Sequence, residues 1–149
     1  MSDADLRIVP FEPADQARAR ALILAGMVEH WGTLDESLNP DLIDITSTYA
    51  SGAFLCAWSG DDLVGTGALK RHADGTAEIV RMSVVRAWRR RGVGRAIVAA
   101  LLDEARTLGH RRIILETTET WDDAVRFYLS LGFVITHHQN GEVYFALDL

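Results

Sequence analysis

The hydrophobic pattern of the chain changes its period after residue 85, and this change limits the folds available to it. Three runs, 53–58, 63–72 and 76–85, are rich in apolar and β-branched residues and are separated by turns with Gly and Asp, as in an antiparallel meander. From Val93 to Leu108 the apolar residues recur at spacings of three and four, which predicts an amphipathic helix. The next run, 111–118, has a continuous apolar middle and predicts a buried central strand.

The remaining segments complete the order of elements. The other expected elements are a strand at 6–11, helices at 13–31, 41–50 and 120–133, and a hairpin over 134–149. Gly109 and Gly132 stand where left-handed helix caps are expected, Thr120 and Asp123 fit a capping box, and Asn140-Gly141 suits a type I′ turn. The order β-α-α-β-β-β-α-β-α-β-β describes an α+β (three-layer α/β) fold, in which a mixed, mostly antiparallel sheet has helices on both faces.

Composition narrows the class of protein. A chain of 149 residues with 48% apolar residues is expected to form one domain, 1–149. The formal net charge of −6 argues against nucleic-acid binding, which depends on cationic surfaces. The single cysteine, Cys56, cannot form an intrachain disulfide, and the sequence has neither a signal-peptide pattern nor a membrane-length apolar run. We therefore expect a soluble, cytoplasmic protein.

The turn before the amphipathic helix, Arg89-Arg90-Arg91-Gly92-Val93-Gly94-Arg95, has four arginines and two glycines. A helix N-terminus exposes unpaired N–H groups and a partial positive charge, so it attracts phosphate. Glycines let a ligand approach those amides closely, and arginines add charge and bidentate contacts. The alternative is an ordinary solvated turn.

Other phosphate-binding and anion-binding motifs fit less well. A P-loop requires Gly-Lys-Ser/Thr, but the only lysine is Lys70. A dinucleotide-binding turn would need Gly or Ala where Ile97 stands, although Glu116 lies where a ribose-binding acid would be expected. RNA binding through residues 86–95 lacks stacking aromatics beyond Trp88 and acts against the negative net charge.

The sequence Arg89-x-x-Gly92-x-Gly94 matches the Arg/Gln-x-x-Gly-x-Gly/Ala pyrophosphate signature of GNAT-type N-acetyltransferases, which use acetyl-coenzyme A (acetyl-CoA). "EIVRMSV" lies upstream and "AVRFYLSLGF" downstream, where that family has its acetyl-binding strand and its tyrosine-bearing helix. The element order resembles this acyl-CoA N-acyltransferase (GNAT) fold from Leu6 to Leu147. The resemblance implies transfer of acetyl from acetyl-CoA to a primary amine of a small molecule or peptide, without a covalent acyl-enzyme.

The resemblance also implies an acid and a base. Glu78 aligns with the glutamate that histone-type acetyltransferases use as base; on strand alternation it would share one face with Val80, Met82 and Val84. Apolar neighbours would raise the pKa of such a carboxylate. The alternative is a structural Glu78, either solvated or paired, for example with Arg81 or Lys70. Tyr128 stands where the family places a tyrosine beside the coenzyme A sulfur, and it is the expected acid or sulfur hydrogen-bond donor; the alternative is a packing role.

Residues of three segments are expected to contact acetyl-CoA: Met82, Ser83, Val84, Arg89, Arg90, Arg91, Gly92, Val93, Gly94, Arg95, Trp121 and Phe127. The contacts at Met82–Val84 are implied for backbone amides on a strand that splays from its neighbour. Trp121 departs from the family, because many relatives have an asparagine there that bonds the coenzyme. We expect the indole either to wall the pantetheine channel or to pack under the helix.

The remaining candidates concern metals, the acceptor and assembly. His137 and His138 are adjacent on a strand and point to opposite faces, so we expect no metal site, and Cys56 is expected to be inert inside an apolar strand. The acids Glu29, Asp35, Glu36 and Asp41 either favour a cationic acceptor amine or are solvated. The expected partners are acetyl-CoA and an amine, without nucleic acid or membrane; a homodimer is left open. The alternative function is a non-catalytic acyl-CoA sensor of the same fold.

Overall fold

The structure is a computed structural model that describes residues 6–32 and 39–149, and its elements follow the expected order. Short 3-10 turns at Pro13–Asp15, Pro40–Leu42 and Arg86–Trp88 are added to that order. The strands are β1 (Leu6–Pro10), β2 (Ala53–Ser59), β3 (Asp62–Arg71), β4 (Thr76–Val84), β5 (Arg112–Thr118), β6 (Val134–Gln139) and β7 (Glu142–Asp148). The helices are α1 (Gln16–Trp31), α2 (Ile45–Thr48), α3 (Val93–Thr107) and α4 (Asp122–Ser130).

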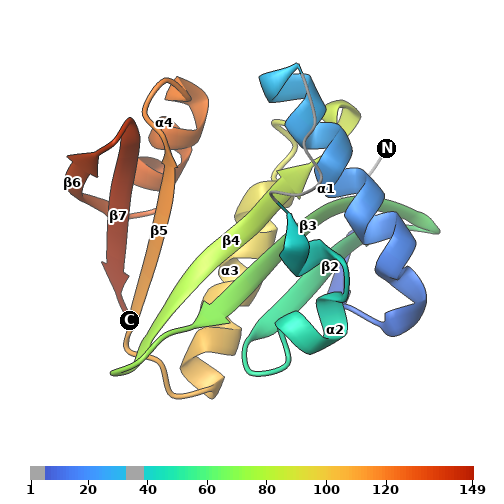
Figure 1. Cartoon of the computed structure of the whole chain (residues 1–149), viewed down its shortest axis with the longest axis horizontal. Helices are drawn as coiled ribbons and strands as arrows, with labels where there is room; N and C mark the ends of the chain where they lie inside the picture. The colour runs from blue at the N-terminus through green and yellow to red at the C-terminus, as the bar shows by residue number, and fades with distance from the viewer. Residues whose placement is uncertain (1–5, 33–38) are drawn as a thin grey trace.

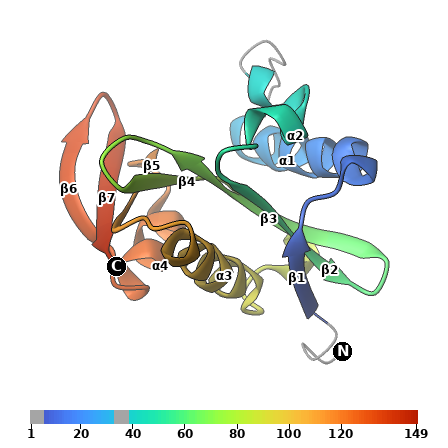
Figure 2. The same ribbon diagram turned by 90° about the horizontal axis from the view of Figure 1, so that it is seen from below.

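The strands form one seven-stranded sheet in the order β1-β2-β3-β4-β5-β7-β6. Neighbouring strands are antiparallel except β4 and β5, which run parallel. Helices α1 and α2 lie on one face, and α3 and α4 lie on the other (Figures 1 and 2). The predicted α+β fold, with a mixed, mostly antiparallel sheet between helices, is therefore confirmed.

An apolar core forms on each face of the sheet, because strand side chains alternate between the two faces. Helices α3 and α4 pack over the larger core, which is centred on Ile97, Leu101 and Phe145. Helices α1 and α2 pack over the smaller core, around Ile23 and Ile45. The three- and four-residue spacing in α3 thus reflects burial of one helix face, as predicted.

The two halves of the sheet separate soon after they join. β4 and β5 pair only over Thr76–Glu78 and Arg112–Ile114, and beyond these residues the two strands diverge (Figure 1). Among residues 6–32 and 39–149, the second half of β4 therefore has no strand partner on its β5 side. This confirms the splayed strand that the family resemblance implied.

A β-bulge interrupts β4 at Arg81. The β3–β4 register shifts between Thr66 and Ala68, so that β4 has one more residue than β3 across this interval. Arg81 has a φ of 55°, in the left-handed region that non-glycine residues adopt rarely. A bulge of this kind bends the strand and interrupts the alternation of its side chains.

The bulge changes which face the later side chains of β4 reach. Val80 packs into the core under α1, whereas Met82 and Val84 pack against the core under α3. The expectation that Glu78, Val80, Met82 and Val84 share one face is therefore wrong. The extra residue at the bulge reverses the alternation halfway along the strand.

The turns follow their predicted chemistry. Gly109 and Gly132, which follow α3 and α4, have φ values of 85° and 96°, as left-handed helix caps require. Asn140 and Gly141 have φ values of 53° and 80°, and this pair of positive values defines the type I′ turn between β6 and β7.

The predicted capping box at Thr120 and Asp123 is wrong. α4 begins at Asp122, and its N-cap is Trp121, whose side chain makes no capping hydrogen bond. The Trp121 N–H instead donates to the Thr118 carbonyl at 3.0 Å. A backbone turn therefore replaces the side-chain cap, and the indole contacts α1 instead.

Gly67 of β3 lies opposite the bulge, where an added Cβ would come within 2.5 Å of the Ile97 side chain and 2.7 Å of the Met82 sulfur. Gly67→Ala should lower the free energy of unfolding by about 1–3 kcal/mol, because it overpacks the junction of α3 with the bulge. Urea denaturation followed by circular dichroism measures this change. The control Ala99→Ser, on the exposed side of α3, should stay within about 0.5 kcal/mol of wild type. Equal stability of Gly67→Ala and wild type would contradict this packing.

Candidate active site

A cleft of about 580 Å³ lies where β4 and β5 diverge, between the end of α1 and the start of α4. This volume is in the range of small-molecule sites. α1 contributes Met27 and Trp31, β4 contributes the segment 79–84, β5 contributes Glu116, and α4 contributes Tyr128. The cleft therefore brings together four elements that are far apart in the sequence.

The floor of the cleft includes unpaired backbone of β4. Pairing with β5 ends at Glu78, and residues 79–84 line the cleft beyond that point. Unpaired backbone N–H and C=O groups are costly when they are buried, so such an edge is usually satisfied by water or a ligand. An extended ligand could add to this edge as a strand would.

The predicted phosphate cradle has the backbone shape that anion sites use. Arg90 and Gly92 both have left-handed backbone, with φ values of 61° and 84°, and alternating backbone of this kind turns successive N–H groups toward one point. Gly92 is the N-cap of α3 and has no side-chain cap. The first-turn amides of α3 are therefore left for a ligand, while the Val93 side chain is buried in the core.

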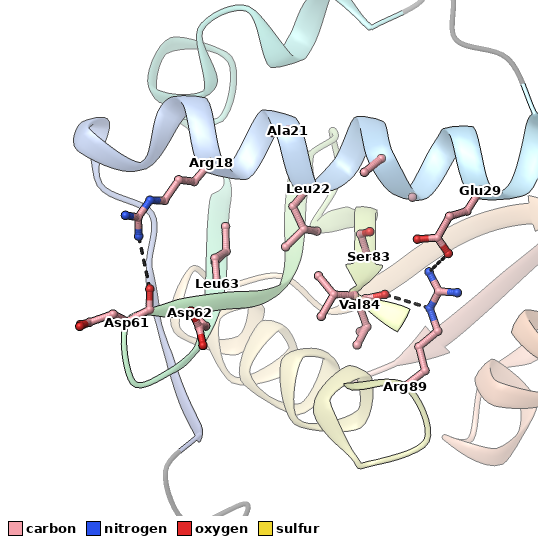
Figure 3. Close-up of a pocket in the computed structure, with 13 residues that line it drawn as sticks. Arg18, Ala21, Leu22, Glu29, Asp61, Asp62, Leu63, Ser83, Val84 and Arg89 are labelled. Carbon is pink, nitrogen blue, oxygen red and sulfur yellow. Dashed lines mark hydrogen bonds and ion pairs between the residues drawn. The ribbon is translucent and has the colours of Figure 1, made fainter. Parts of the chain in front are cut away.

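The Arg89 side chain braces the turn internally. Its Nε donates to the Val84 carbonyl at 2.9 Å, and its Nη2 lies 2.9 Å from Glu29 Oε2 on α1 (Figure 3). An adjoining groove, drawn in Figure 3, lies between α1, the start of β3 and the end of β4. Its volume is about 420 Å³. Glu29 and Arg89 line both this groove and the cleft. The guanidinium predicted to contact the coenzyme is thus engaged with α1 and β4.

The other arginines of the turn differ in their surroundings. The side chains of Arg86 and Arg90 are 83% and 89% exposed. Arg91 lies over the Trp88 ring, with its guanidinium carbon 4.1 Å from the ring centroid, and Arg95 reaches toward α4. Arg86 and Arg90 are thus highly exposed, and each guanidinium lies 3.9 Å from a carboxylate oxygen, of Glu29 and Asp123 respectively.

Gly94 allows the first turn of α3 to approach α4 closely. A Cβ at this position would lie 3.3 Å from the Phe127 ring and 3.9 Å from Val84. Phe127 thus packs at the junction of the two helices, and it is not among the described residues that line the cleft. Its predicted contact with the coenzyme stays a prediction.

Tyr128 combines a buried ring with a position on the cleft wall. The ring is 8% exposed and packs edge-on against Phe127 and Phe133, with centroids 5.0 and 5.8 Å away. Within residues 6–32 and 39–149 its hydroxyl has no hydrogen-bond partner, and Tyr128 lines the cleft. Burial raises the pKa of the phenol. At neutral pH the side chain is therefore a neutral donor available to a ligand.

Two glutamates are relevant to a base, and sequence reasoning singled out only one of them for this role. Glu78 Oε1 lies 2.7 Å from His72 Nε2, and Glu78 is absent from the described lining of the cleft. Glu78 is thus paired, but with His72 and not with Arg81 or Lys70. Glu116 of β5 does line the cleft, and its carboxylate raises the pKa of the neighbouring Tyr144 phenol. The resemblance implied that β4 diverges from β5, but the sequence analysis did not connect this divergence with Glu116.

Three aromatic side chains form the rim of the cleft. The Trp121 ring centroid lies 3.8 Å from that of His30 and 6.1 Å from that of Trp31, and all three residues line the cleft. Trp121 therefore lines the cleft, and its expected role as a wall of the pantetheine channel stays a prediction. The aromatic rim, as we call His30, Trp31 and Trp121, joins the end of α1 to the start of α4.

The acids proposed to attract a cationic acceptor are largely engaged elsewhere. Glu29 pairs with Arg89, and Asp41 pairs with Arg81 at 2.6 Å. The other two acids, Asp35 and Glu36, lie outside the described residues. Glu29 and Asp41 are therefore ion-pair partners within the fold.

The two histidines of β6 have separate neighbours. His137 stacks on Tyr144 with a centroid distance of 4.3 Å, and His138 Nδ1 lies 4.0 Å from a carboxylate oxygen of Glu119. Across 6–32 and 39–149 no three His, Cys, Asp or Glu side chains gather in a way that could hold a metal ion. The expected absence of a metal stays a prediction.

The unpaired strand edge, the helix N-terminus without a side-chain cap and the tyrosine on the cleft wall are features that the resemblance led us to expect. A family model described as "Acetyltransferase (GNAT) family" matches residues 17–133. The chain belongs to the acetyltransferase (GNAT) family. The resemblance inferred from Arg89-x-x-Gly92-x-Gly94 is thereby confirmed.

Similar proteins agree with this assignment. The chain is 34% identical to N-acetyltransferase 8F1 of Rattus norvegicus over 103 residues, which cover 64% of this chain and 47% of the relative. The chain thus spans about half the length of this relative. A GNAT-family acetyltransferase from Staphylococcus aureus shares the fold with a TM-score of 0.89 at 19% identity, over 97% of this chain and 99% of that one. A Bacillus subtilis acetyltransferase solved in complex with CoA gives a TM-score of 0.76 at 24% identity, over 97% and 99%.

The structure also bears on membrane insertion. In the described part of the chain, no helix is both long enough and apolar enough to span a bilayer.

Cys56 of β2 is fully buried, and burial, with a smaller contribution from Asp15, raises its pKa to about 12. Because the thiolate is the reactive form, native Cys56 should react with a thiol reagent at neutral pH at least about 100-fold more slowly than in denaturant. The absorbance of the released chromophore measures the rate, and Cys56→Ala provides the blank. Equal rates in the native and denatured states would show that the thiol is accessible.

Proposed function

We propose that the protein is an acetyl-CoA-dependent N-acetyltransferase that moves the acetyl group to a primary amine by direct attack. The observation that carries this proposal is the cleft along the edge of β4 that β5 leaves unpaired, which Tyr128 and the arginines Arg86 and Arg89 before α3 also line. Family membership supports it. Two structural neighbours are described with coenzyme A and with acetyl-CoA bound.

In this proposal the turn and α3 hold the pyrophosphate of coenzyme A. The amides that follow Gly92 would donate to phosphate oxygens, with the helix dipole in favour. Arg86 and Arg90 would add long-range attraction because their side chains are exposed. Arg89 would act through its bonds to Val84 and Glu29, which hold the turn against β4 and α1.

The unpaired edge of β4 would hold the pantetheine arm and the acetyl group. Amides of Met82–Val84 would donate to the arm and to the thioester carbonyl oxygen, which gains negative charge during attack. The bound thioester supplies the activated acetyl group. Recognition by backbone is consistent with a Met82 side chain that packs into the α3 core and a Ser83 side chain that lies against Gly26 of α1.

Tyr128 is the proposed acid. As the amine nitrogen bonds to the carbonyl carbon, the carbon–sulfur bond breaks and the sulfur leaves as a thiolate. The Tyr128 hydroxyl, which is protonated and has no other partner among the described residues, would give its proton to that sulfur. The packed aromatic rings around Tyr128 fix its direction.

Glu116 is the base that the structure favours, and Glu78 is the alternative that the resemblance implied. Glu116 lines the cleft, so its carboxylate can take the proton of an acceptor ammonium directly or through one water. Glu78 is separated from the lining and is bonded to His72, so it would act only through intervening groups. The acceptor would lie between Glu116 and the aromatic rim.

A cytoplasmic location remains part of the proposal, supported by the single unpaired Cys56. A homodimer also remains part of it. Light scattering in solution tests the assembly.

Acetyl-CoA at 100 times its dissociation constant should raise the free energy of unfolding by about 2.7 kcal/mol. Thermal denaturation measures this stabilisation, and a thiol-release assay over a panel of primary amines measures transfer. Absence of any stabilisation at saturating acetyl-CoA would contradict the cradle. Stabilisation without thiol release for any amine would favour a non-catalytic acyl-CoA sensor.

Gly94→Val is the matched variant for this test. The branched side chain would push the first turn of α3 away from Phe127 and Val84, and the dissociation constant of coenzyme A should rise at least about tenfold. The same kind of change at Ala99, on the exposed side of α3, should leave the constant unchanged. Isothermal titration calorimetry compares the two variants.

Tyr128→Phe keeps the packed ring but removes the proposed proton donor. With a working amine, kcat should fall by roughly 100-fold while coenzyme A affinity changes little. Full activity of Tyr128→Phe would show that the hydroxyl is not the proton donor and that the side chain only packs.

Glu116→Gln and Glu78→Gln distinguish the two carboxylates in the same assay. Glu116→Gln should lose activity at neutral pH and recover part of it as pH rises, because more of the amine is then already deprotonated. Glu78→Gln should have the smaller effect. The reverse order of the two variants would restore Glu78 as the base.

A further inference from the structure

Arg81, the bulge residue of β4, is held at both its backbone and its side chain. Its carbonyl accepts a hydrogen bond from the fully buried Thr66 hydroxyl at 2.9 Å. Its guanidinium donates twice to Asp41, from Nε to Oδ2 at 2.8 Å and from Nη2 to Oδ1 at 2.6 Å. A left-handed arginine persists only where its surroundings fix it, and these contacts supply the fixation.

Asp41 receives a third hydrogen bond, from the Tyr49 hydroxyl to Oδ2 at 2.7 Å. Asp41 and its second partner Tyr49 both lie near α2: Asp41 is in the 3-10 turn Pro40–Leu42, and Tyr49 follows α2. We call Asp41, Arg81 and Tyr49 the Asp41 strut. It links the segment between α1 and α2 to the middle of β4.

The protonation states in the strut suit this link. Burial opposes ionisation of Asp41, but hydrogen bonds from Arg81 and Tyr49 outweigh it and lower the pKa of the carboxyl. Burial and the Asp41 carboxylate raise the pKa of Tyr49. At neutral pH the strut is thus a carboxylate that accepts from a guanidinium and a neutral phenol, with no net charge.

The strut includes Arg81, which directly precedes Met82, a residue whose N–H is a proposed donor to the thioester carbonyl oxygen. The peptide that follows Arg81 carries the Met82 N–H, and both residues line the cleft. The direction of that N–H depends on the backbone angles of Arg81, because a peptide unit is rigid. A donor to a developing oxyanion must be aimed before reaction, and small misplacements lower the rate strongly.

We propose that the Asp41 strut is a positioning device, which locks Arg81 in its left-handed conformation and so aims the Met82 N–H at the thioester carbonyl oxygen. Asp41 and Arg81 act through the Met82 amide and do not take part in proton transfer. The strut also makes the turn Pro40–Leu42, which does not line the cleft, a support of carbonyl polarisation. This inference rests on the proposed acetyl transfer.

Two variants remove the strut in different ways. Asp41→Asn keeps the size of the side chain but removes its charge. Arg81→Gly removes the guanidinium and leaves a residue that adopts a φ of 55° without steric cost, so the chain can still fold around the bulge. Tyr49→Phe removes one hydrogen bond and leaves the ion pair. The control Asp103→Asn breaks an exposed Arg106–Asp103 pair on α3, which has a distance of 3.3 Å.

Asp41→Asn and Arg81→Gly should lower kcat by about 10- to 100-fold with the dissociation constant of acetyl-CoA within about twofold of wild type. Tyr49→Phe should lie between these variants and wild type, and Asp103→Asn should equal wild type. An unchanged kcat in both Asp41→Asn and Arg81→Gly would overturn the proposal. So would a loss of acetyl-CoA affinity as large as the loss of kcat, because the strut would then only support the fold.

The infrared stretching frequency of the thioester carbonyl reports the hydrogen bond that its oxygen accepts from the Met82 N–H. In wild type, carbonyl-labelled acetyl-CoA should show a lower C=O frequency on binding than in water, and the two strut variants should lose most of that shift. An equal shift in wild type and both variants would overturn the strut. Wild-type protein that binds no acetyl-CoA would contradict the proposed function instead.

Amide hydrogen exchange of the ligand-free protein checks the strut separately. Asp41→Asn should speed exchange in 79–84, and unchanged exchange there would contradict the strut.

Discussion

The parallel pairing of β4 and β5 ends after Glu78, and the cleft exists because of that early end. A strand in the middle of a sheet normally satisfies its backbone groups on both sides. Here β4 pairs with β3 along its length except at the bulge around Arg81, and it pairs with β5 only over Thr76–Glu78. The edge of β4 beyond Glu78, on its β5 side, is therefore available to a ligand or to water. The helices on either face then wall this edge, with α1 on one side and α4 on the other.

Some of the charged side chains form ion pairs within the fold. The net charge is −6, yet the sequence gathers arginines at one turn. Arg89 ties that turn to Glu29 of α1, and Arg81 ties the bulge to Asp41. The Arg81–Asp41 pair is partly shielded and hydrogen-bonded, whereas the side chains of Arg89 and Glu29 are 43% and 36% exposed. Exposed pairs contribute little to stability. The first pair joins the turn Pro40–Leu42 to β4, and the second joins α1 to the turn before α3.

Local signals in the sequence predicted most of the fold, because they act over a few residues. The period of α3, the glycine after each of α3 and α4, and the Asn140-Gly141 turn all depend on neighbours in the chain. The bulge at Arg81 does not, because it depends on contacts with Thr66 and Asp41 that lie 15 and 40 residues away. Strand alternation therefore placed Met82 and Val84 on the wrong face.

The same limit applies to the site. The phosphate cradle could be located from its glycines because backbone shape is local. The position of Glu116 on the cleft wall required the divergence of two strands, which no short pattern encodes. Likewise, Thr120 and Asp123 have the residue types of a capping box, but the backbone turn at Trp121 starts the helix later.

The four tryptophans lie in two environments that differ in solvent exposure, and two of them belong to the aromatic rim. Trp58 and Trp88 are buried in the two cores, whereas Trp31 and Trp121 are 53% and 38% exposed, with ring centroids 6.1 Å apart at the cleft. Indole emission depends on solvent contact and on neighbouring rings such as His30. The unlabelled protein therefore has an intrinsic fluorophore pair at the mouth of its cleft, while the other two indoles provide a constant background from the cores. Rapid mixing could follow entry of a ligand through this emission, at rates that a product assay does not resolve.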